Sequence, residues 1–206
     1  MPKDTFYNLA EEKRMKIYGA ALDEFSNHPF KQASVNRIVK NAGIAKGSFY
    51  QYFKDKKDLY KYLIDEIYKK KITYLTPTMK NPFDMNFFDL LRDIYASGLK
   101  FAKDNPQLAK IGYHMLRDSG QEVFNEVIDE KKGEGIQIYK QILELGIKRG
   151  DIRSDINLDM SAYFLFQLGN SLSNDFIEFF DTGEEKQVFN LVEGMIEMLK
   201  SGIGKK

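Results

Sequence analysis

Apolar residues recur three and four positions apart along almost the whole chain, and this spacing most restricts the possible fold. It places the apolar side chains on one face of an α-helix, whereas a half-buried strand would alternate apolar and polar residues. Alternating runs of β-branched residues are few. The pattern therefore predicts an all-α protein of about nine helices.

The composition is that of a globular protein that folds in water, with 43% hydrophobic and 30% charged residues. The first residues carry charges throughout, and the most apolar run, near 160–172, is interrupted by Gln167 and Asn170. We therefore expect no signal peptide, no membrane span and a cytoplasmic location. The sequence has no cysteine, which excludes disulfides and thiolate metal ligands.

Charge is unevenly distributed, although the formal net charge is only +1. Residues 1–70 carry 14 lysine and arginine residues against 9 acidic ones, whereas the remainder carries 17 against 21. A basic segment joined to an acidic one is typical of a nucleic-acid-binding domain fused to another domain, but an excess of this size also arises by chance. The motifs in the basic segment have to decide between these interpretations.

The basic segment is predicted to open with an amphipathic helix that begins at Asn8. Asn8 and Glu11 have the spacing of a capping box, and the turn-forming segment 27–29, Asn-His-Pro, ends the helix. Its apolar stripe is expected to consist of Met15, Tyr18, Leu22 and Phe25.

Two shorter helices follow. The second helix has Ser34 as its predicted N-cap and ends at Gly43, which suits the left-handed position after a helix. An Ala-Gly-Ile turn leads to a third helix over about 46–52, and a fourth helix over 55–75 begins with Asp55 as its N-cap. Two short helices joined by such a turn have the dimensions of a helix-turn-helix, whose second helix enters the major groove of DNA.

The stretches AALDEF, SVNRIVKNAG and IAKGSFYQYF, followed by the K-x-x-L start of the fourth helix, resemble the TetR family of transcriptional regulators. The resemblance covers about residues 14–60. It implies an N-terminal three-helix DNA-binding domain, a linking fourth helix, and a C-terminal helical domain that dimerises through its last two long helices. In this family the C-terminal domain usually encloses a ligand pocket.

The resemblance also implies which residues meet DNA. The third helix would bring Lys46, Gly47, Ser48 and Gln51 to the groove, while Tyr50 and Tyr52 match phosphate-contacting positions. Ser34 and Asn36 would lie against the backbone or groove edge, and Lys56 would hold a phosphate at the start of the fourth helix. Lys57 is interpreted as a surface charge.

A turn-rich segment after Leu75, TPTMKNP, marks the expected boundary between a DNA-binding domain over 1–55 and a ligand-binding and dimerisation domain over 56–206, with the fourth helix shared. In the second domain Gly133 and Gly135 favour a kink or break within a long helix. The aromatic and polar residues of this domain either line a ligand pocket or fill the bundle core. The pocket candidates are Phe101, Tyr113, Phe124, Tyr139, Phe164, Gln167 and Asn170.

The function indicated is a ligand-responsive regulator, with repression favoured, that binds a pseudo-palindromic double-stranded DNA operator as a homodimer and senses a small apolar or aromatic ligand. The alternative is an architectural or protein-regulated DNA-binding factor without a small-molecule ligand. An enzyme is not expected, because phosphate-binding and nucleophile motifs are absent and His28 and His114 lack partners at metal-ligand spacing. We expect neither a metal nor a cofactor.

Overall fold

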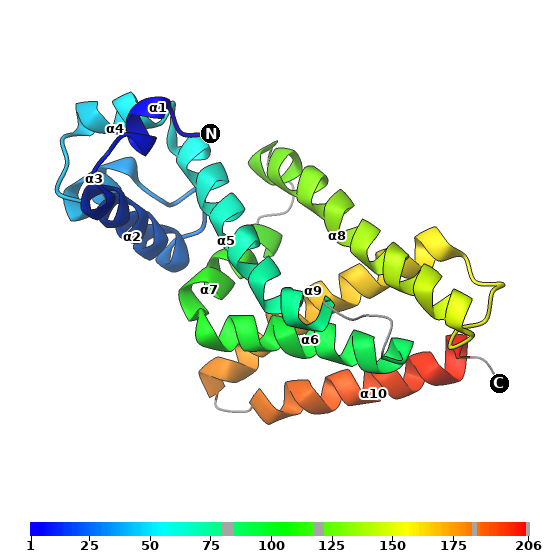
Figure 1. Ribbon diagram of the computed structural model, residues 1–206. Coiled ribbons are helices and arrows are strands. Elements are labelled where there is room, and N and C mark those ends of the chain that lie inside the picture. The colour runs from blue at the N-terminus through cyan, green and yellow to red at the C-terminus, as the bar shows by residue number, and fades with distance from the viewer. Residues whose placement is uncertain (80–84, 118–121, 183–184, 205–206) are drawn as a thin grey trace. The chain divides into compact units, whose positions relative to one another are not determined.

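The computed structural model describes residues 1–79, 85–117, 122–182 and 185–204, without the side chains of 76–79, 116–117, 122–131, 173–182 and 185–186. Within this part the chain is all-α, and one isolated β-bridge joins Ile152 to Gly204 (Figure 1). The described helices are α1 (Asp4–Tyr7), α2 (Glu11–Asn27), α3 (Val35–Asn41), α4 (Lys46–Tyr52), α5 (Lys56–Met79), α6 (Phe87–Asp104), α7 (Pro106–Arg117), α8 (Glu122–Arg149), α9 (Leu158–Thr182) and α10 (Glu185–Ile203).

The chain forms two compact units, one of residues 1–70 with 105–127 and the other of 71–104 with 128–206. The helix α7 packs on α2 and so belongs to the first unit, although the sequence led us to expect it in the C-terminal domain. Both α5 and α8 contribute residues to the two units.

The start of the first unit differs from the sequence-based prediction. The additional helix α1 comes first, and α2 begins at Glu11 rather than Asn8, with no side-chain cap at its N-terminus. Its buried face includes Ile17, Ala21 and Phe25, whereas Met15 is exposed. Ile17, Ala21 and Phe25 recur every four residues, so the apolar stripe has the helical period but a different phase from the one predicted.

The ends of the short helices follow local backbone chemistry. Gly43 has a φ of 66°, as predicted, and lets the chain leave α3 and turn toward α4. At the start of α5 the Asp55 side chain accepts the backbone N–H of Asp58 at 2.8 Å, and the Asp58 side chain accepts that of Lys54 at 3.1 Å. These reciprocal bonds fix the first turn of α5, and Asp55 is its N-cap as predicted.

Two helices run past the breaks that the sequence suggested. The helix α5 continues to Met79 and includes Pro77, which removes one backbone donor close to the C-terminus, where few hydrogen bonds are lost. The helix α8 is continuous through Gly133 and Gly135. A Cβ at Gly135 would lie 2.5 Å from the ring of Phe166, so a glycine here lets α9 approach α8 closely.

The second unit is a bundle in which α6, α9 and α10 pack against one another. The inner face of α6 includes the buried residues Phe87, Leu91, Ile94 and Leu99. Helix starts in this unit are capped by asparagine: Asn86 accepts the N–H of Phe88 at 2.9 Å, and Asn157 accepts that of Met160 at 3.0 Å.

Candidate nucleic-acid interface

The short helix α4 has one buried and one exposed side. Phe49 is fully buried and its ring contacts the equally buried Phe53, so these two residues anchor α4 to the first unit. The exposed side carries Lys46, Gly47 and Gln51, with Tyr50 46% exposed and Ser48 half-buried. Five of the six predicted α4 contact residues are therefore accessible, and together they offer an ammonium, a hydroxyl, a phenol and an amide.

Gly47 leaves open space on this side of α4. A Cβ built at this position meets no other heavy atom within 4 Å, so packing within the chain does not require glycine here. The missing side chain instead exposes the backbone of the first turn, where free N–H groups favour an anion.

Tyr52 departs from its predicted role as an exposed phosphate contact. Its side chain is only 6% exposed, and its ring lies 6.3 Å from that of Phe6, between centroids. The sequence did not reveal this, because Phe6 comes from a helix, α1, that the pattern did not predict. Lys13 lies over the same ring, with Nζ 5.8 Å from the centroid.

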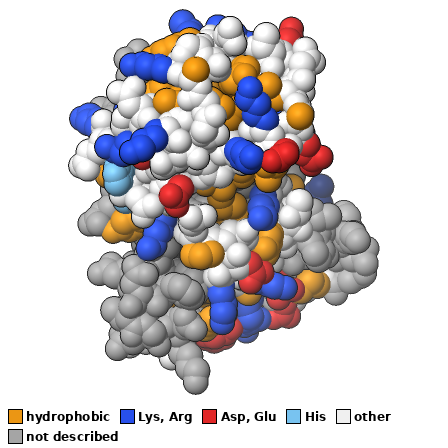
Figure 2. Space-filling view, turned by 90° about the vertical axis from the view of Figure 1, so that its left-hand side faces the viewer, with side chains coloured by type: hydrophobic (Ala, Val, Ile, Leu, Met, Phe, Trp, Pro, Cys, Tyr) orange, Lys and Arg blue, Asp and Glu red, His pale blue; other side chains and the backbone are white. Residues whose placement is uncertain are grey.

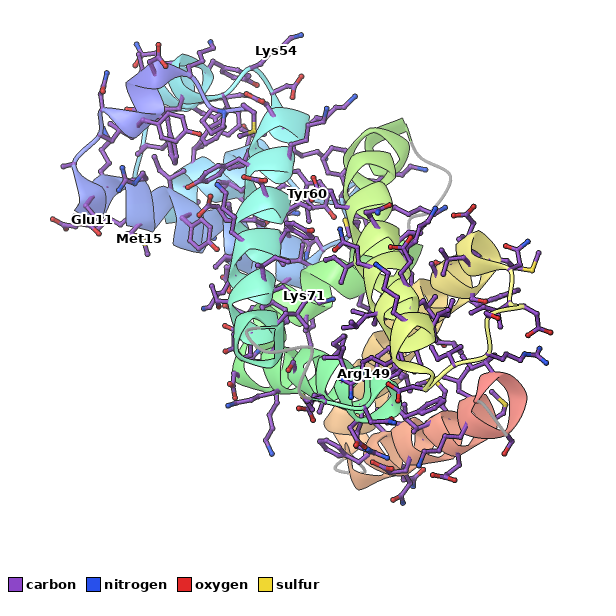
Figure 3. All side chains as sticks on the ribbon, turned by 45° about the vertical axis from the view of Figure 1, so that its right-hand side comes forward. Glu11, Met15, Lys54, Tyr60, Lys71 and Arg149 are labelled. Carbon is purple, nitrogen blue, oxygen red and sulfur yellow. The ribbon has the colours of Figure 1, made fainter. Side chains whose placement is uncertain are left out.

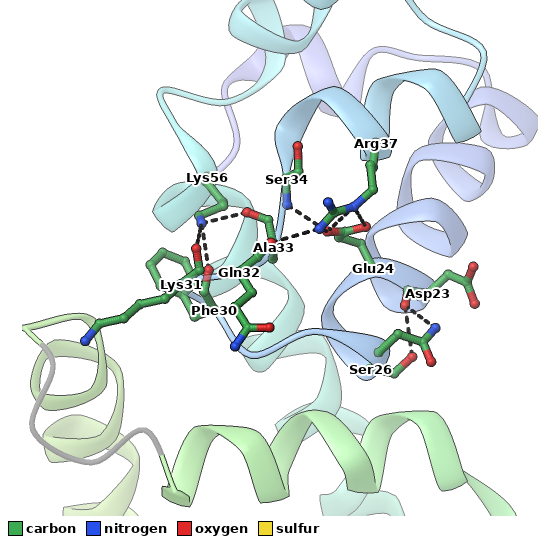
Figure 4. A network of polar contacts seen from close by, with 11 residues as sticks. Asp23, Glu24, Ser26, Phe30, Lys31, Gln32, Ala33, Ser34, Arg37 and Lys56 are labelled. Atoms are coloured by element: carbon green, nitrogen blue, oxygen red, sulfur yellow. Dashed lines mark hydrogen bonds and ion pairs between the residues drawn. The ribbon is translucent and has the colours of Figure 1, made fainter.

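The start of α3 is held by a buried carboxylate. Glu24 of α2 accepts the backbone N–H of Ser34 at 2.7 Å and the N–H of Arg37 Nε, which both carboxylate oxygens share at 3.0 Å (Figure 4). Ser34 occupies the N-cap position but its hydroxyl makes no capping bond to the helix. Asn36, in the first turn, is exposed. The role of Glu24 was missed, since one glutamate in a charged helix carries no distinguishing signal in sequence.

The Lys56 side chain is already engaged within the first unit. Its ammonium donates to the carbonyls of Phe30 at 2.6 Å and Ala33 at 2.8 Å, and Nζ lies 4.6 Å from the centroid of the Phe30 ring (Figure 4). Burial lowers the pKa of Lys56. The resemblance implied a phosphate contact for Lys56, whereas in this structure its ammonium fastens the loop between α2 and α3 to α5.

The N-terminal segment braces the C-terminal end of α4. The backbone N–H of Lys3 donates to the Tyr52 carbonyl at 2.9 Å, its ammonium donates to the Tyr50 carbonyl at 2.7 Å, and the Thr5 hydroxyl donates to the Gln51 carbonyl. Phe6 is fully buried beneath these bonds. Carbonyls at a helix C-terminus lack intrahelical partners, so the segment satisfies groups that would otherwise need water.

Exposed cations outnumber exposed carboxylates around α3 and α4. Figure 2, which views the molecule from the left of Figure 1, shows several lysine and arginine side chains spread over this face. A face of this kind attracts a polyanion at long range and adds to affinity without reading sequence. The exposed cations of residues 31–54 are Lys31, Arg37, Lys40, Lys46 and Lys54.

The predicted pocket residues are divided between the two units. In the second unit Tyr139 is half-buried, its ring lies 6.2 Å from Tyr95 and 6.4 Å from Phe166, and Phe101 is buried against Tyr74. Tyr113 belongs to the first unit, Asn170 is half-buried, and the Phe124 side chain lies outside the described residues.

Phe164 and Gln167 are the pocket candidates whose exposure agrees least with an interior pocket. Phe164 is 55% exposed and Gln167 is also exposed. The face of α9 that is turned into the unit carries Ala162, Leu165 and Leu172 instead. Gln167, a predicted polar residue of the pocket, thus lies on the outside of the helix.

Tyr95, which is buried, and Tyr139, which is half-buried, form a pair of phenols in the second unit. The Tyr95 hydroxyl donates to the Leu165 carbonyl at 2.9 Å. Burial raises the pKa of both phenols, which stay protonated at neutral pH. The arrangement ties α6 to α9 and offers no group suited to acid–base chemistry near neutral pH.

A surface hollow in the second unit has a volume of about 630 Å³. Asn86, Asp89, Asp151 and Lys200 contribute to its lining, and Asp151 accepts the Phe87 N–H at 3.0 Å.

Among the described side chains, no group of three or more metal-ligating residues comes together. Nor does the part of the chain that was searched contain a helix with the length and apolar character needed to cross a membrane.

Two family models match the chain. One, described as "Bacterial regulatory proteins, tetR family", covers residues 17–63, and the other, described as "Tetracyclin repressor-like, C-terminal domain", covers residues 85–204. The first match spans α3 and α4, whose exposed residues form the candidate interface.

Curated relatives and solved structures agree with these matches. The "Fatty acid metabolism regulator protein" of Bacillus subtilis is 24% identical over 94% of this chain and 97% of its own length, and the "Probable acrEF/envCD operon repressor" of Escherichia coli is 23% identical over 73% and 70%. A TetR family transcriptional regulator from Chloroflexus aurantiacus is 32% identical over the whole of both chains, with a TM-score of 0.73. FadR from Bacillus subtilis, solved in complex with stearoyl-CoA, is 23% identical over 92% of this chain and 98% of its own, with a TM-score of 0.73.

Proposed function

Because the chain belongs to the tetR family of bacterial regulatory proteins, we propose that it is a homodimeric, ligand-responsive repressor that reads a pseudo-palindromic DNA operator. The observation that carries the proposal is the exposed side of α4, where Lys46, Tyr50 and Gln51 project from a helix anchored by the buried Phe49. A rigidly held helix of this width fits the major groove, where side-chain donors can meet base edges.

Different residues contribute different parts of DNA recognition. Gln51 and Lys46 read bases, since an amide pairs with adenine and an ammonium with guanine. Ser48 and the backbone at Gly47 face the groove beside them, while Tyr50 contacts a phosphate and helps to set the position of the helix. Asn36 and the N–H groups at the start of α3 add a contact at the groove edge.

An exposed apolar surface on the last two helices supports the dimer. Residues that would face water in a single chain include Met160, Tyr163 and Phe164 on α9, and Phe189, Leu191 and Met198 on α10. Large exposed apolar groups on adjoining helices are typical of a surface that another molecule covers. In the proposed dimer the two recognition helices lie about 34 Å apart, one helical turn of DNA.

The second unit is the proposed ligand-sensing part. FadR, whose fold this chain shares, was solved with stearoyl-CoA, which supports a ligand with a long apolar chain. Such a ligand would release the operator by binding better to a conformation in which the two recognition helices are wrongly spaced. The alternative, a DNA-binding factor regulated without a small molecule, would need no such preference.

Selection of bound duplexes from a random pool, followed by fluorescence anisotropy, tests the DNA-binding part. We expect Gln51→Ala and Lys46→Ala to change the preferred sequence and to weaken binding to the selected operator by about 5–100-fold. Lys100→Ala, an exposed lysine of α6, is the matched control and should bind like the wild type. An unchanged sequence preference in both α4 variants would contradict the assigned base contacts.

Light scattering tests the dimer separately. Phe164→Glu introduces a charge on the exposed apolar surface and should shift the protein toward the monomer and weaken operator binding. A wild-type protein that remains monomeric and binds every duplex alike would overturn the proposed function.

A further inference from the structure

Lys71 lies on the inward-facing stripe of α5. The buried residues of this helix recur at Tyr60, Ile64 and Ile67, and the next two positions of the same series are Lys71 and Tyr74. Figure 3 shows Lys71 on the same side of α5 as the buried Tyr60. Tyr74 packs its ring on that of Phe101, with centroids 5.4 Å apart, so the face of α5 that carries Lys71 is turned into the second unit.

The ammonium of Lys71 has no hydrogen-bond or ion-pair partner among the described residues. Its side chain is half-buried, and none of the hydrogen bonds or ion pairs in that part of the chain involves it. The neighbouring Lys69 instead forms ion pairs with Asp65 and Glu66 at 2.8 Å, on the exposed side of the helix. Burial lowers the pKa of Lys71, whereas the two carboxylates raise that of Lys69.

An unpaired ammonium in apolar surroundings is costly, and chains seldom keep one without a use. Here the neighbours along the stripe are Ile67 and an aromatic pair, so the position would suit leucine or methionine better than lysine if packing were its only purpose. Because Lys71 is half-buried, part of its side chain stays accessible. An anion with an apolar body that reaches the ammonium would supply a partner.

We propose that Lys71 binds the anionic group, a carboxylate or a phosphate, of an amphipathic ligand whose apolar part lies against the aromatic residues of the second unit. The proposal rests on the ligand-sensing function given above and adds the residue and the ligand chemistry to it. The charge of the Lys71 ammonium is then neutralised only in the liganded protein. The ligand therefore binds more tightly to the conformation that encloses it than to other conformations.

Calorimetric titration with three probes of one chain length tests the proposal: hexadecanoate, hexadecanoyl-CoA and hexadecan-1-ol. The wild type should bind at least one anionic probe about tenfold or more tightly than the alcohol, and Lys71→Gln should remove this preference. Lys71→Arg should retain it, and so should Lys70→Gln, which removes an exposed charge from the adjacent position. The probe that shows the preference distinguishes a carboxylate from a phosphate ligand.

Thermal unfolding separates a binding role from a structural one. Lys71→Met removes a half-buried charge that has no partner among the described residues, and it should raise Tm by about 2–4 °C while it abolishes the preference for the anion. The proposal is overturned if the alcohol binds the wild type as tightly as the anions, if no probe binds, or if Lys71→Met lowers Tm. Operator binding without ligand should be equal in the wild type and in Lys71→Gln, so a failure of the DNA-binding function would be visible independently.

Discussion

The guanidinium of Arg37 and the carboxylate of Glu24 form an ion pair that joins α3 to α2, with the two shortest N–O distances at 2.5 and 3.0 Å. Glu24 is 5% exposed, whereas the Arg37 side chain is 48% exposed. The same carboxylate also accepts the backbone N–H of Ser34, the residue before α3. One buried acid thus fixes both the start and the orientation of the helix that precedes the recognition helix.

Arg37→Ala should lower the free energy of unfolding, because it leaves a buried carboxylate with the Ser34 N–H as a remaining donor. The free energy of unfolding of Arg37→Lys should lie between those of the wild type and Arg37→Ala. An ammonium restores the charge but not the geometry with two nitrogen donors. Urea unfolding followed by circular dichroism measures both. A stability of Arg37→Ala equal to that of the wild type would show that the pair contributes nothing to folding.

The free energy of unfolding should decrease in acid because Glu24 becomes protonated. Burial alone would raise the pKa of this carboxyl, but the hydrogen bonds from Arg37 and Ser34 and the charge of Arg37 together lower the pKa below the 4.5 usual for glutamate. A lowered pKa means that the native state holds the charged form better than the unfolded state does. The contribution is therefore complete above about pH 4.5 and is lost as the pH falls through the lower native pKa. The free energy of unfolding of Glu24→Gln should show a smaller decrease over this range than that of the wild type.

Helical periodicity was sufficient to predict the all-α class and the order of the helices in the DNA-binding part, because burial of one helix face repeats along the chain. The turn at Gly43 and the N-cap at Asp55 were predictable for a similar reason, since few residues fit those backbone positions. The position of the first helix was predicted wrongly. Asn8 and Glu11 have the spacing of a capping box, but α1 places Asn8 at its own C-terminal end.

Contacts between distant segments could not be read from the sequence. The spacing within α4 cannot show that Tyr52 is covered by Phe6, or that the donors of Lys56 are taken by the loop after α2. The exposure of Phe164 was missed for a related reason: aromatic content identifies residues that avoid water but not the side of the helix on which they lie. Phe164 is exposed because the helix phase that buries Leu165 turns it outward.

Lys56→Met should destabilise the first unit by about 1–3 kcal/mol, because the carbonyls of Phe30 and Ala33 lose a charged donor. Operator binding should weaken in proportion to the loss of folded protein, not through one phosphate contact. The dependence of affinity on salt concentration distinguishes the two, since loss of a phosphate contact would reduce its slope by about 1. Lys54→Ala, an exposed lysine, is the control for charge alone.

Phe6→Ala should affect DNA binding, because Phe6 belongs to the N-terminal segment that holds the C-terminal end of α4. The substitution empties a fully buried site beside Phe53 and Tyr62, which should lower the free energy of unfolding by about 3–5 kcal/mol. Lys3→Met is the milder variant, because it removes the ammonium from the Tyr50 carbonyl and keeps the backbone bond to Tyr52. It should leave Tm within a few degrees and accelerate hydrogen exchange in α4. Unchanged exchange would mean that the Lys3 side chain does not brace this helix.

Gly133 and Gly135 form a matched pair within α8 that tests the close approach of α9. A Cβ at Gly133 meets no other heavy atom within 4 Å, so Gly133→Ala should raise the free energy of unfolding by about 1 kcal/mol through helix propensity alone. A Cβ at Gly135 would lie 2.5 Å from Phe166 Cε2, and the displaced ring should turn the same substitution into a loss of about 1–3 kcal/mol. In Gly135→Ala combined with Phe166→Leu the loss should be smaller than the sum of the two single substitutions, because the smaller side chain admits the methyl group. If Gly133→Ala and Gly135→Ala changed the free energy of unfolding in the same direction, this result would contradict the contact between Gly135 and Phe166.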